Sequence, residues 1–248
     1  MILLRDQFTE LLAARQKDST LQAFQLSESL PAPGKDPDDQ TAQCLFDIGF
    51  SMESFCNDRA AAELFRRALQ YAVAEPNIHS NAWFRLGLSL ERLGNWFEAL
   101  DCHRKCLTLA HDWPQLISLA RLHLADLLCA AEEYSEAAEV YKQAMDGAAD
   151  PVQVKYARCL LRMGEADLAE AELCALLDKV EDGPLAVDAR QLLAEIHERA
   201  QNPEAAAECY SRIAGSSHAD PHVRAAAAHR LSTMPKSKRG KRNPLIFK

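Results

Sequence analysis

The chain has 248 residues, 48% of them apolar, only nine glycines and a formal net charge of −8. This composition favours helices and provides ample material for a buried core. Six basic residues and no acidic one lie between Lys236 and Lys248, so the rest of the chain carries about −14, which argues against broad nucleic-acid binding by its body.

The N-terminal segment begins with a short apolar run, Met1 to Leu4, followed at once by Arg5 and Asp6. That run is too short for a signal peptide, and no stretch of the chain approaches membrane-spanning length. Residues 1–41 are expected to form a helical cap or a degenerate repeat, with a loop from residue 31. The eight cysteines are scattered rather than arranged as a disulfide framework, which predicts a reducing, cytoplasmic location.

A repeated pattern occupies the centre of the chain. Its clearest copy reads Trp83-x-x-Leu86-Gly87-x-x-Leu90, followed by Gly94 and Ala99. Four further copies align on a small residue, and the successive separations are 38, 38, 32 and 37 residues. The aligned small residues are Gly49, Gly87, Ala125, Ala157 and Ala194. A period of this length predicts stacked copies of one supersecondary unit rather than a single globular core.

Each copy is expected to form two antiparallel helices. The first carries the small residue among large apolar ones, and the second carries an alanine with an aromatic or aliphatic residue four positions later. A glycine or alanine lets a large side chain of the neighbouring helix pack closely. Prolines fall between the units, where they end one helix or begin the next. Asp150-Pro151 and Asp220-Pro221 are expected to be N-cap and first-turn pairs.

This pattern resembles the tetratricopeptide repeat, whose signature is W-x2-L-G-x2-Y followed by A-x3-F and proline. The resemblance implies an all-α, right-handed superhelical solenoid of antiparallel helix pairs, with about five clear repeats over residues 42–217. A capping helix is expected over 218–234. His103 departs from the family pattern, because an aromatic residue is usual at its position. The family further implies a non-catalytic scaffold that binds a segment of another protein in its concave groove.

The expected groove residues lie beside the packing stripe of the first helices, four positions apart. They are Phe46, Phe50, Phe84, Leu88, Leu122, Arg158 and Arg162. Two interpretations remain open: an exposed apolar strip that holds an extended or helical partner segment, or a strip already covered by residues 2–30 or by tight packing. The arginines would pair with acidic groups of the same ligand. A site for the terminal carboxylate of a partner, which some members of this family have, is not expected, because apolar residues occupy the equivalent positions here.

No metal, cofactor or catalytic site is predicted. Cys102, His103 and Cys106 lack a matched second pair of zinc ligands, and His123 and Cys129 would reach them only through folding. No acid, base and nucleophile can be assembled into one constellation. The chain is therefore predicted not to be an enzyme.

The basic tail, residues 235–248, is expected to be disordered on its own. Its basic side chains are Lys236, Lys238, Arg239, Lys241 and Arg242. They offer contacts to nucleic acid or to an anionic membrane, a nuclear address signal, or simply a solubilising end. The main prediction is an adaptor, assembly factor or co-chaperone. The alternative is a nucleic-acid-associated factor that acts through this tail, and a regulatory subunit of an enzyme is not distinguished from an adaptor.

Overall fold

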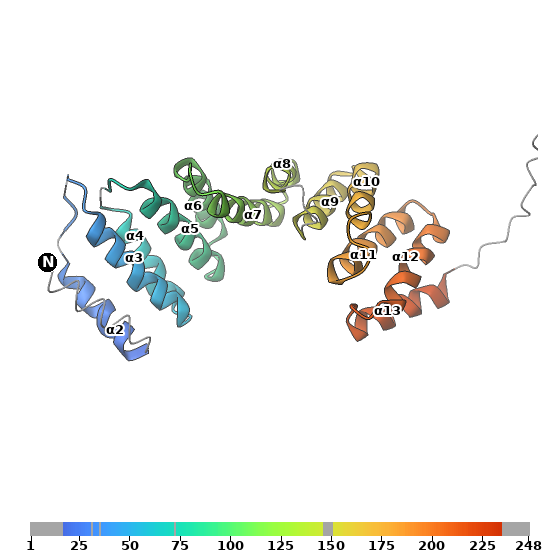
Figure 1. Ribbon diagram of the computed structural model, residues 1–248, viewed down its shortest axis with the longest axis horizontal. Coiled ribbons are helices and arrows are strands. Elements are labelled where there is room, and N and C mark those ends of the chain that lie inside the picture. The colour runs from blue at the N-terminus through green and yellow to red at the C-terminus, as the bar shows by residue number, and fades with distance from the viewer. Residues whose placement is uncertain (1–16, 31, 35, 72, 146–150, 235–248) are drawn as a thin grey trace, which may run out of the picture. The chain divides into compact units, whose positions relative to one another are not determined.

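The computed structural model describes residues 17–30, 32–34, 36–71, 73–145 and 151–234. These residues form helices and connecting turns, and they contain no strand. The chain divides into two compact units, with the boundary after Glu132. The helices, shown in Figure 1, are α2 (Lys17–Leu26), the 3-10 helix η1 (Ser27–Ser29), α3 (Asp39–Ser54), α4 (Asp58–Ala68), α5 (Pro76–Arg92), α6 (Trp96–Leu109), α7 (Pro114–Ala130), α8 (Tyr134–Ala144), α9 (Pro151–Met163), α10 (Ala166–Leu177), α11 (Pro184–Arg199), α12 (Pro203–Gly215) and α13 (Pro221–Thr233).

Many helices begin at the prolines that the sequence places between the repeats. Helices α5, α7, α9, α11 and α13 each begin at one of the prolines that separate the repeats. Proline is suited to the first turn because that turn leaves its backbone N–H groups unpaired. Asp220 caps α13 by accepting a hydrogen bond from the His222 N–H at 2.8 Å, as predicted. Asp150, the other predicted cap, lies outside the described residues.

One turn geometry recurs between the two helices of each repeat. Gly94 and Gly164 adopt positive φ angles of 79° and 88°, and Cys56, Glu132 and Gln201 adopt positive φ at the equivalent places. These five residues are separated by the same 38, 38, 32 and 37 residues as the aligned small residues. A left-handed residue just after a helix is a common C-terminal cap. The repeat therefore extends to the backbone conformation.

In the first unit, consecutive helices pack as antiparallel neighbours, and the first helices α3, α5 and α7 also contact one another in sequence order. Gly49 faces the ring of Phe65, and a Cβ atom at this glycine would lie 2.9 Å from that ring. Gly87 faces His103 in the same way, at 2.6 Å. The prediction that the small residue admits a large side chain is confirmed at both positions.

Helix α2 packs against α3, and polar contacts tie this N-terminal segment to the first repeat. The hydroxyls of Thr20 and Ser51 lie 3.0 Å apart. Arg67 at the end of α4 donates hydrogen bonds to the hydroxyl and carbonyl of Ser27, at 3.0 and 2.8 Å. Helix α3 begins at Asp39, before the expected start of the repeat array at residue 42.

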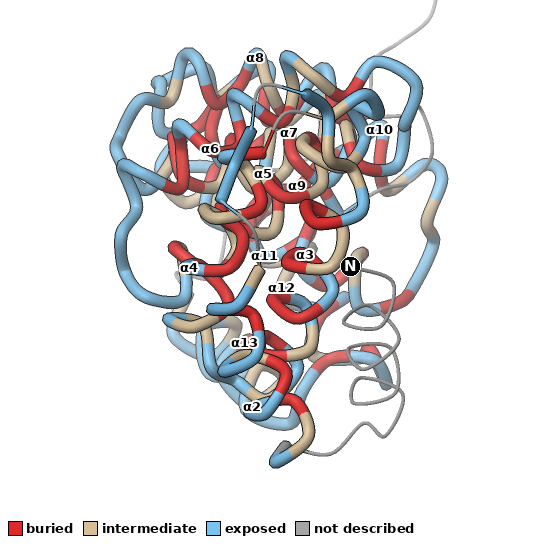
Figure 2. The backbone as a smooth tube through the Cα atoms, turned by 90° about the vertical axis from the view of Figure 1, so that its left-hand side faces the viewer, coloured by how far each residue is buried: buried red, intermediate tan, exposed pale blue. Residues whose placement is uncertain are grey.

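The second unit has its own apolar core. Leu160, Leu173 and Leu193 come from α9, α10 and α11 and are at most 4% exposed. Helix α13 packs on α12 and buries Ala227 near Ile213. Along the helices, buried stretches alternate with exposed ones (Figure 2). The exposed helix faces of this unit are the surfaces that a partner can reach.

Candidate functional site

Two of the aromatic residues expected in the groove are buried. Phe46 is 8% exposed and its ring lies 5.5 Å from that of Phe65 on α4. Phe84 is 5% exposed, and its ring centroid lies 5.6 Å from that of His103 and 5.8 Å from that of His123. Of the two interpretations left open by the sequence, a strip covered by tight packing therefore applies to these two residues. The second helices α4 and α6 cover them, because the apolar face of the first helix is wider than the stripe marked by the glycines.

The other apolar residues of the predicted groove remain nearer the surface. Phe50 is 44% exposed, and the guanidinium of Arg85 lies over its ring at 4.6 Å. Leu88 and Leu122 are half-buried on α5 and α7. These three residues lie on the first helices of successive repeats, as the sequence predicted.

A charged network links the first two repeats of this unit. Glu53 is buried near the end of α3, and its carboxylate accepts hydrogen bonds from Arg85, at 3.4 Å, and from Arg92. Arg92 also pairs with Asp58 at 3.3 Å. A carboxylate buried beside cations keeps its charge at lower cost than an isolated one. The network therefore fixes α5 against both helices of the preceding repeat.

The same link recurs one repeat later with different chemistry. Residues 53 and 85 become Glu91 and His123 when 38 is added to each number. One carboxylate oxygen of Glu91 lies 3.2 Å from His123 Nδ1, and the other lies 2.6 Å from His103 Nε2. The cluster of Glu91, His103 and His123 thus joins α5, α6 and α7. The sequence did not predict this cluster, because its three residues come from two different repeats.

The surroundings of this three-residue cluster are largely apolar. His103 is fully buried on Gly87, and its ring stacks on that of His123 with centroids 5.5 Å apart. Burial alone would raise the pKa of Glu91, but hydrogen bonds from both imidazoles outweigh it and lower that pKa to about 2. His103 Nδ1 has no hydrogen-bond partner within the described part of the chain.

The two cysteines that flank His103 are thiols rather than reactive thiolates. Burial raises the pKa of Cys102 and Cys106 to about 12, so both thiols stay protonated at neutral pH. A thiol is a nucleophile or metal ligand as its thiolate. Their burial on α6 therefore favours a packing role.

The predicted arginines line hollows on the second unit. Arg158 and Arg162 of α9 border a hollow of about 150 Å³ together with Gln191 and Glu195 of α11. A second hollow of about 460 Å³ shares Gln191 and Glu195 and continues to Arg230 of α13. We call this run the α9–α11–α13 surface, and its polar members are Arg158, Arg162, Gln191, Glu195, Glu198 and Arg230.

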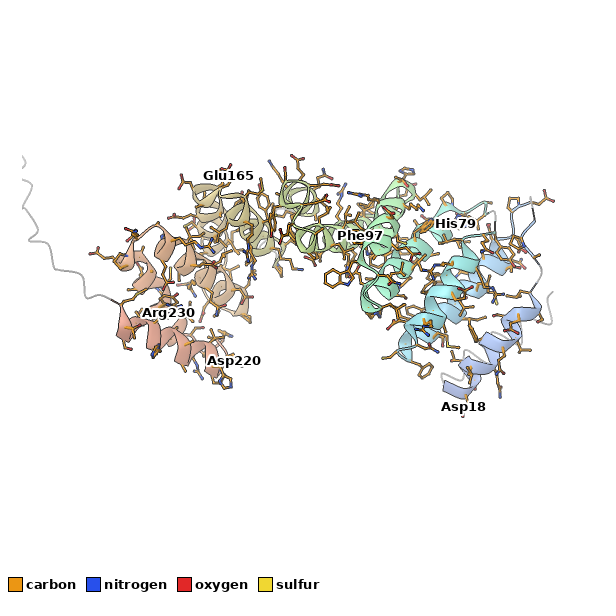
Figure 3. The ribbon with its side chains drawn as sticks, turned by 180° about the vertical axis from the view of Figure 1, so that it is seen from behind. Asp18, His79, Phe97, Glu165, Asp220 and Arg230 are labelled. Carbon is orange, nitrogen blue, oxygen red and sulfur yellow. The ribbon has the colours of Figure 1, made fainter. Side chains whose placement is uncertain are left out.

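The charges on the α9–α11–α13 surface are unequally paired. Glu195 pairs with Arg199 at 2.5 Å, and Glu198 pairs with Arg230 at 3.8 Å and accepts a hydrogen bond from the Tyr210 hydroxyl. Figure 3 labels Arg230 on α13. Arg158 and Arg162 are exposed, and among the described residues neither has an ion-pair partner. This end of the surface therefore offers two cations, one helical turn apart, to an external anion.

The basic tail from Lys236 to Arg242 lies outside the described residues. The helices within the described part of the chain include none long and apolar enough to cross a membrane. The geometry thus defines one class of protein, a scaffold of repeated helix pairs.

Two models of the tetratricopeptide repeat match the chain, one over residues 79–150 and the other over residues 157–222, and the chain belongs to this family. A comparison with curated proteins gave no match. Proteins of the family are generally non-catalytic scaffolds, and the repeats support a protein–protein interaction scaffold for this chain.

Solved structures share the fold at low sequence identity. YrrB, a TPR protein with an unusual peptide-binding site, is 18% identical with a TM-score of 0.61, covering 76% of this chain and 92% of YrrB. BtubC from P. vanneervenii is 14% identical with a TM-score of 0.61, covering 97% and 98%. PilW, a type IV pilus biogenesis factor, is 17% identical with a TM-score of 0.59, covering 90% and 96%.

Proposed function

We propose that the chain is a non-catalytic adaptor that holds an acidic segment of a partner protein on the α9–α11–α13 surface. The observation that carries this proposal is the pair of exposed arginines, Arg158 and Arg162, beside a hollow of about 150 Å³. A guanidinium without an internal partner forms charge-assisted hydrogen bonds with carboxylates. The adjoining hollow over α11 and α13 provides room for the segment to continue.

The side chains further along this surface set the orientation of the segment. Glu195 and Glu198 already have cationic partners on the protein, so they add little attraction for a cationic ligand. An acidic residue would dock at the α9 end, and neutral or apolar residues would lie over Val223 and Ala226 of α13. An extended peptide with one charged anchor is a common mode of recognition.

On the first unit, the proposal assigns a separate apolar contact to Phe50, Leu88 and Leu122. Phe50 is the most accessible of the three, and its ring is held in place by Arg85. An aromatic side chain that is already ordered loses little conformational entropy on binding. Phe46 and Phe84 are excluded from this contact by their burial.

The proposal also covers the cell compartment and the question of a nucleic-acid or membrane partner. The eight cysteines are free thiols, which fits a reducing compartment such as the cytoplasm. If the basic tail acts as a nuclear address signal, the compartment is the nucleus instead. Within the described residues, nothing favours nucleic acid or membrane as the partner, so neither is proposed.

The test is affinity capture from cell lysate with the full chain and quantitative mass spectrometry. Arg158→Glu and Arg162→Glu should each lower the amount of the captured partner by about tenfold, which corresponds to about 1.4 kcal/mol of binding free energy. The matched control is Arg212→Glu, which makes the same charge change on the exposed face of the second helix α12. Capture that is unchanged by the α9 variants, or lowered equally by Arg212→Glu, would contradict the proposal.

A further inference from the structure

We propose that Glu91, His103 and His123 form a binding site for one divalent transition-metal ion of the zinc type. Their candidate ligand atoms all lie within 4.8 Å of one another. Two imidazoles and one carboxylate are a known zinc ligand set, and a water molecule completes it in sites with three protein ligands. The site is independent of the α9–α11–α13 surface, because its three residues belong to the first unit.

The preceding repeat shows what these three positions need for folding alone. Subtracting 38 from each number gives Glu53, Phe65 and Arg85. Phe65 fills the space over Gly49 as His103 does over Gly87, and Arg85 pairs with Glu53 as His123 does with Glu91. Packing and the link between repeats are therefore satisfied by two side chains that do not bind metals.

The histidine at position 103 carries a cost that phenylalanine would avoid. Its ring is fully buried, and its Nδ1 atom has no hydrogen-bond partner within the described residues. An unpaired buried polar atom costs stability relative to an apolar atom of the same shape. Replacing the aromatic ring of the repeat pattern by an imidazole thus gains nothing in packing, but it directs Nε2 at the Glu91 carboxylate.

The geometry requires small adjustments to take an ion. Ligand atoms around a tetrahedral zinc ion with bonds of about 2.1 Å lie about 3.4 Å apart. Oε2 of Glu91 lies 3.2 Å from His123 Nδ1, which is close to this value, and Oε1 lies 2.6 Å from His103 Nε2. The carboxylate would therefore have to turn so that one oxygen lies about 3.4 Å from both nitrogens. The Glu91 and His123 side chains are 24% and 29% exposed, so the ion would reach the site past them.

Metal binding at this place would reinforce the junction between two repeats. The three ligands come from α5, α6 and α7, which are successive helices of the first unit. The ion would replace the hydrogen bonds that now link the two imidazoles to the carboxylate. A ligand that binds only the folded state raises its stability by mass action.

The experiment titrates the metal-stripped full chain with Zn²⁺ alone by isothermal calorimetry and repeats its thermal melting with and without the ion. The wild-type chain should bind one ion at this site and melt at a higher temperature in its presence. His103→Phe and His123→Arg introduce the side chains found at the equivalent positions of the preceding repeat. Both variants should therefore stay folded, as measured by circular dichroism. Each should weaken Zn²⁺ binding by more than about a hundredfold, because each removes one of the three ligands.

Two controls separate this site from other zinc-binding groups on the chain. Cys102→Ala with Cys106→Ala, and His229→Gln on α13, should leave the affinity unchanged. The Co²⁺-loaded chain should show d–d bands without the thiolate charge-transfer band of a cysteine ligand. Binding that persists in His103→Phe and His123→Arg, a thiolate band, or no Zn²⁺ binding by the folded wild-type chain would each overturn the proposal.

Discussion

Replacing Phe65 with alanine should lower the free energy of unfolding of the first unit by about 3–5 kcal/mol. Phe65 is fully buried, its ring contacts Gly49, and it packs against Phe46 at 5.5 Å. Truncation removes the ring from the junction of α3 and α4 and leaves a cavity that close-packed neighbours fill only in part. This is the largest loss of stability that we expect from any substitution considered for this unit.

Tryptophan fluorescence is the appropriate measurement for this variant. The three tryptophans of the chain, at positions 83, 96 and 113, all belong to the first unit. Urea unfolding followed by their emission therefore reports that unit. Phe97→Ala is the matched control. Phe97, labelled in Figure 3, is 86% exposed, and its loss should change stability by less than about 0.5 kcal/mol. Equal effects of the two variants would contradict the assignment of Phe65 to the core.

Gly87→Ala should destabilise the same unit by a net amount of about 1–2 kcal/mol, because overpacking outweighs the better helix propensity of alanine. The added Cβ would lie 2.6 Å from Cε1 and 2.8 Å from Nε2 of His103. That ring is fully buried and contacts the rings of Phe84 and His123, so it has little room to move aside. The hydrogen bond that the Glu91 carboxylate accepts from His103 Nε2 should weaken as the ring is displaced.

Gly215→Ala provides the control for Gly87→Ala. Gly215 ends α12 at an exposed position, and nothing lies within 4 Å of the place its Cβ would occupy. The same chemical change should leave stability unchanged or slightly improved when it is measured by urea unfolding and circular dichroism. A loss at Gly215 as large as that at Gly87 would contradict this account, because it would show that close contact with His103 is not the cause of the loss at Gly87.

The sequence predicted the fold well because its signals are local and periodic. Gly49 and Gly87 specify a close approach, and the prolines at 76, 114, 184 and 221 specify helix starts. Each signal acts within a few residues of itself. The same turn geometry at Gly94 and Gln201 shows that the period also covers positions whose residue type does not reveal it.

The surface was predicted less well, because burial depends on what the second helix covers. Phe46 and Phe50 lie four residues apart on α3, yet one is buried against Phe65 and the other is exposed. A linear pattern gives the face of a helix but not the width of the covered part. The Glu91, His103 and His123 cluster was missed for a related reason. Its members come from three helices and two repeats, and they become visible when the repeats are superimposed with Glu53, Phe65 and Arg85.

The most direct measurement of the partner-binding claim is photo-crosslinking from the α9–α11–α13 surface. A photoreactive benzoylphenylalanine placed at Gln191, an exposed residue shared by both hollows, should crosslink to one partner protein at an acidic segment identified by mass spectrometry. The same group at Arg212 on α12 should not crosslink to that partner. A crosslink formed from position 212 and absent from position 191 would contradict the account.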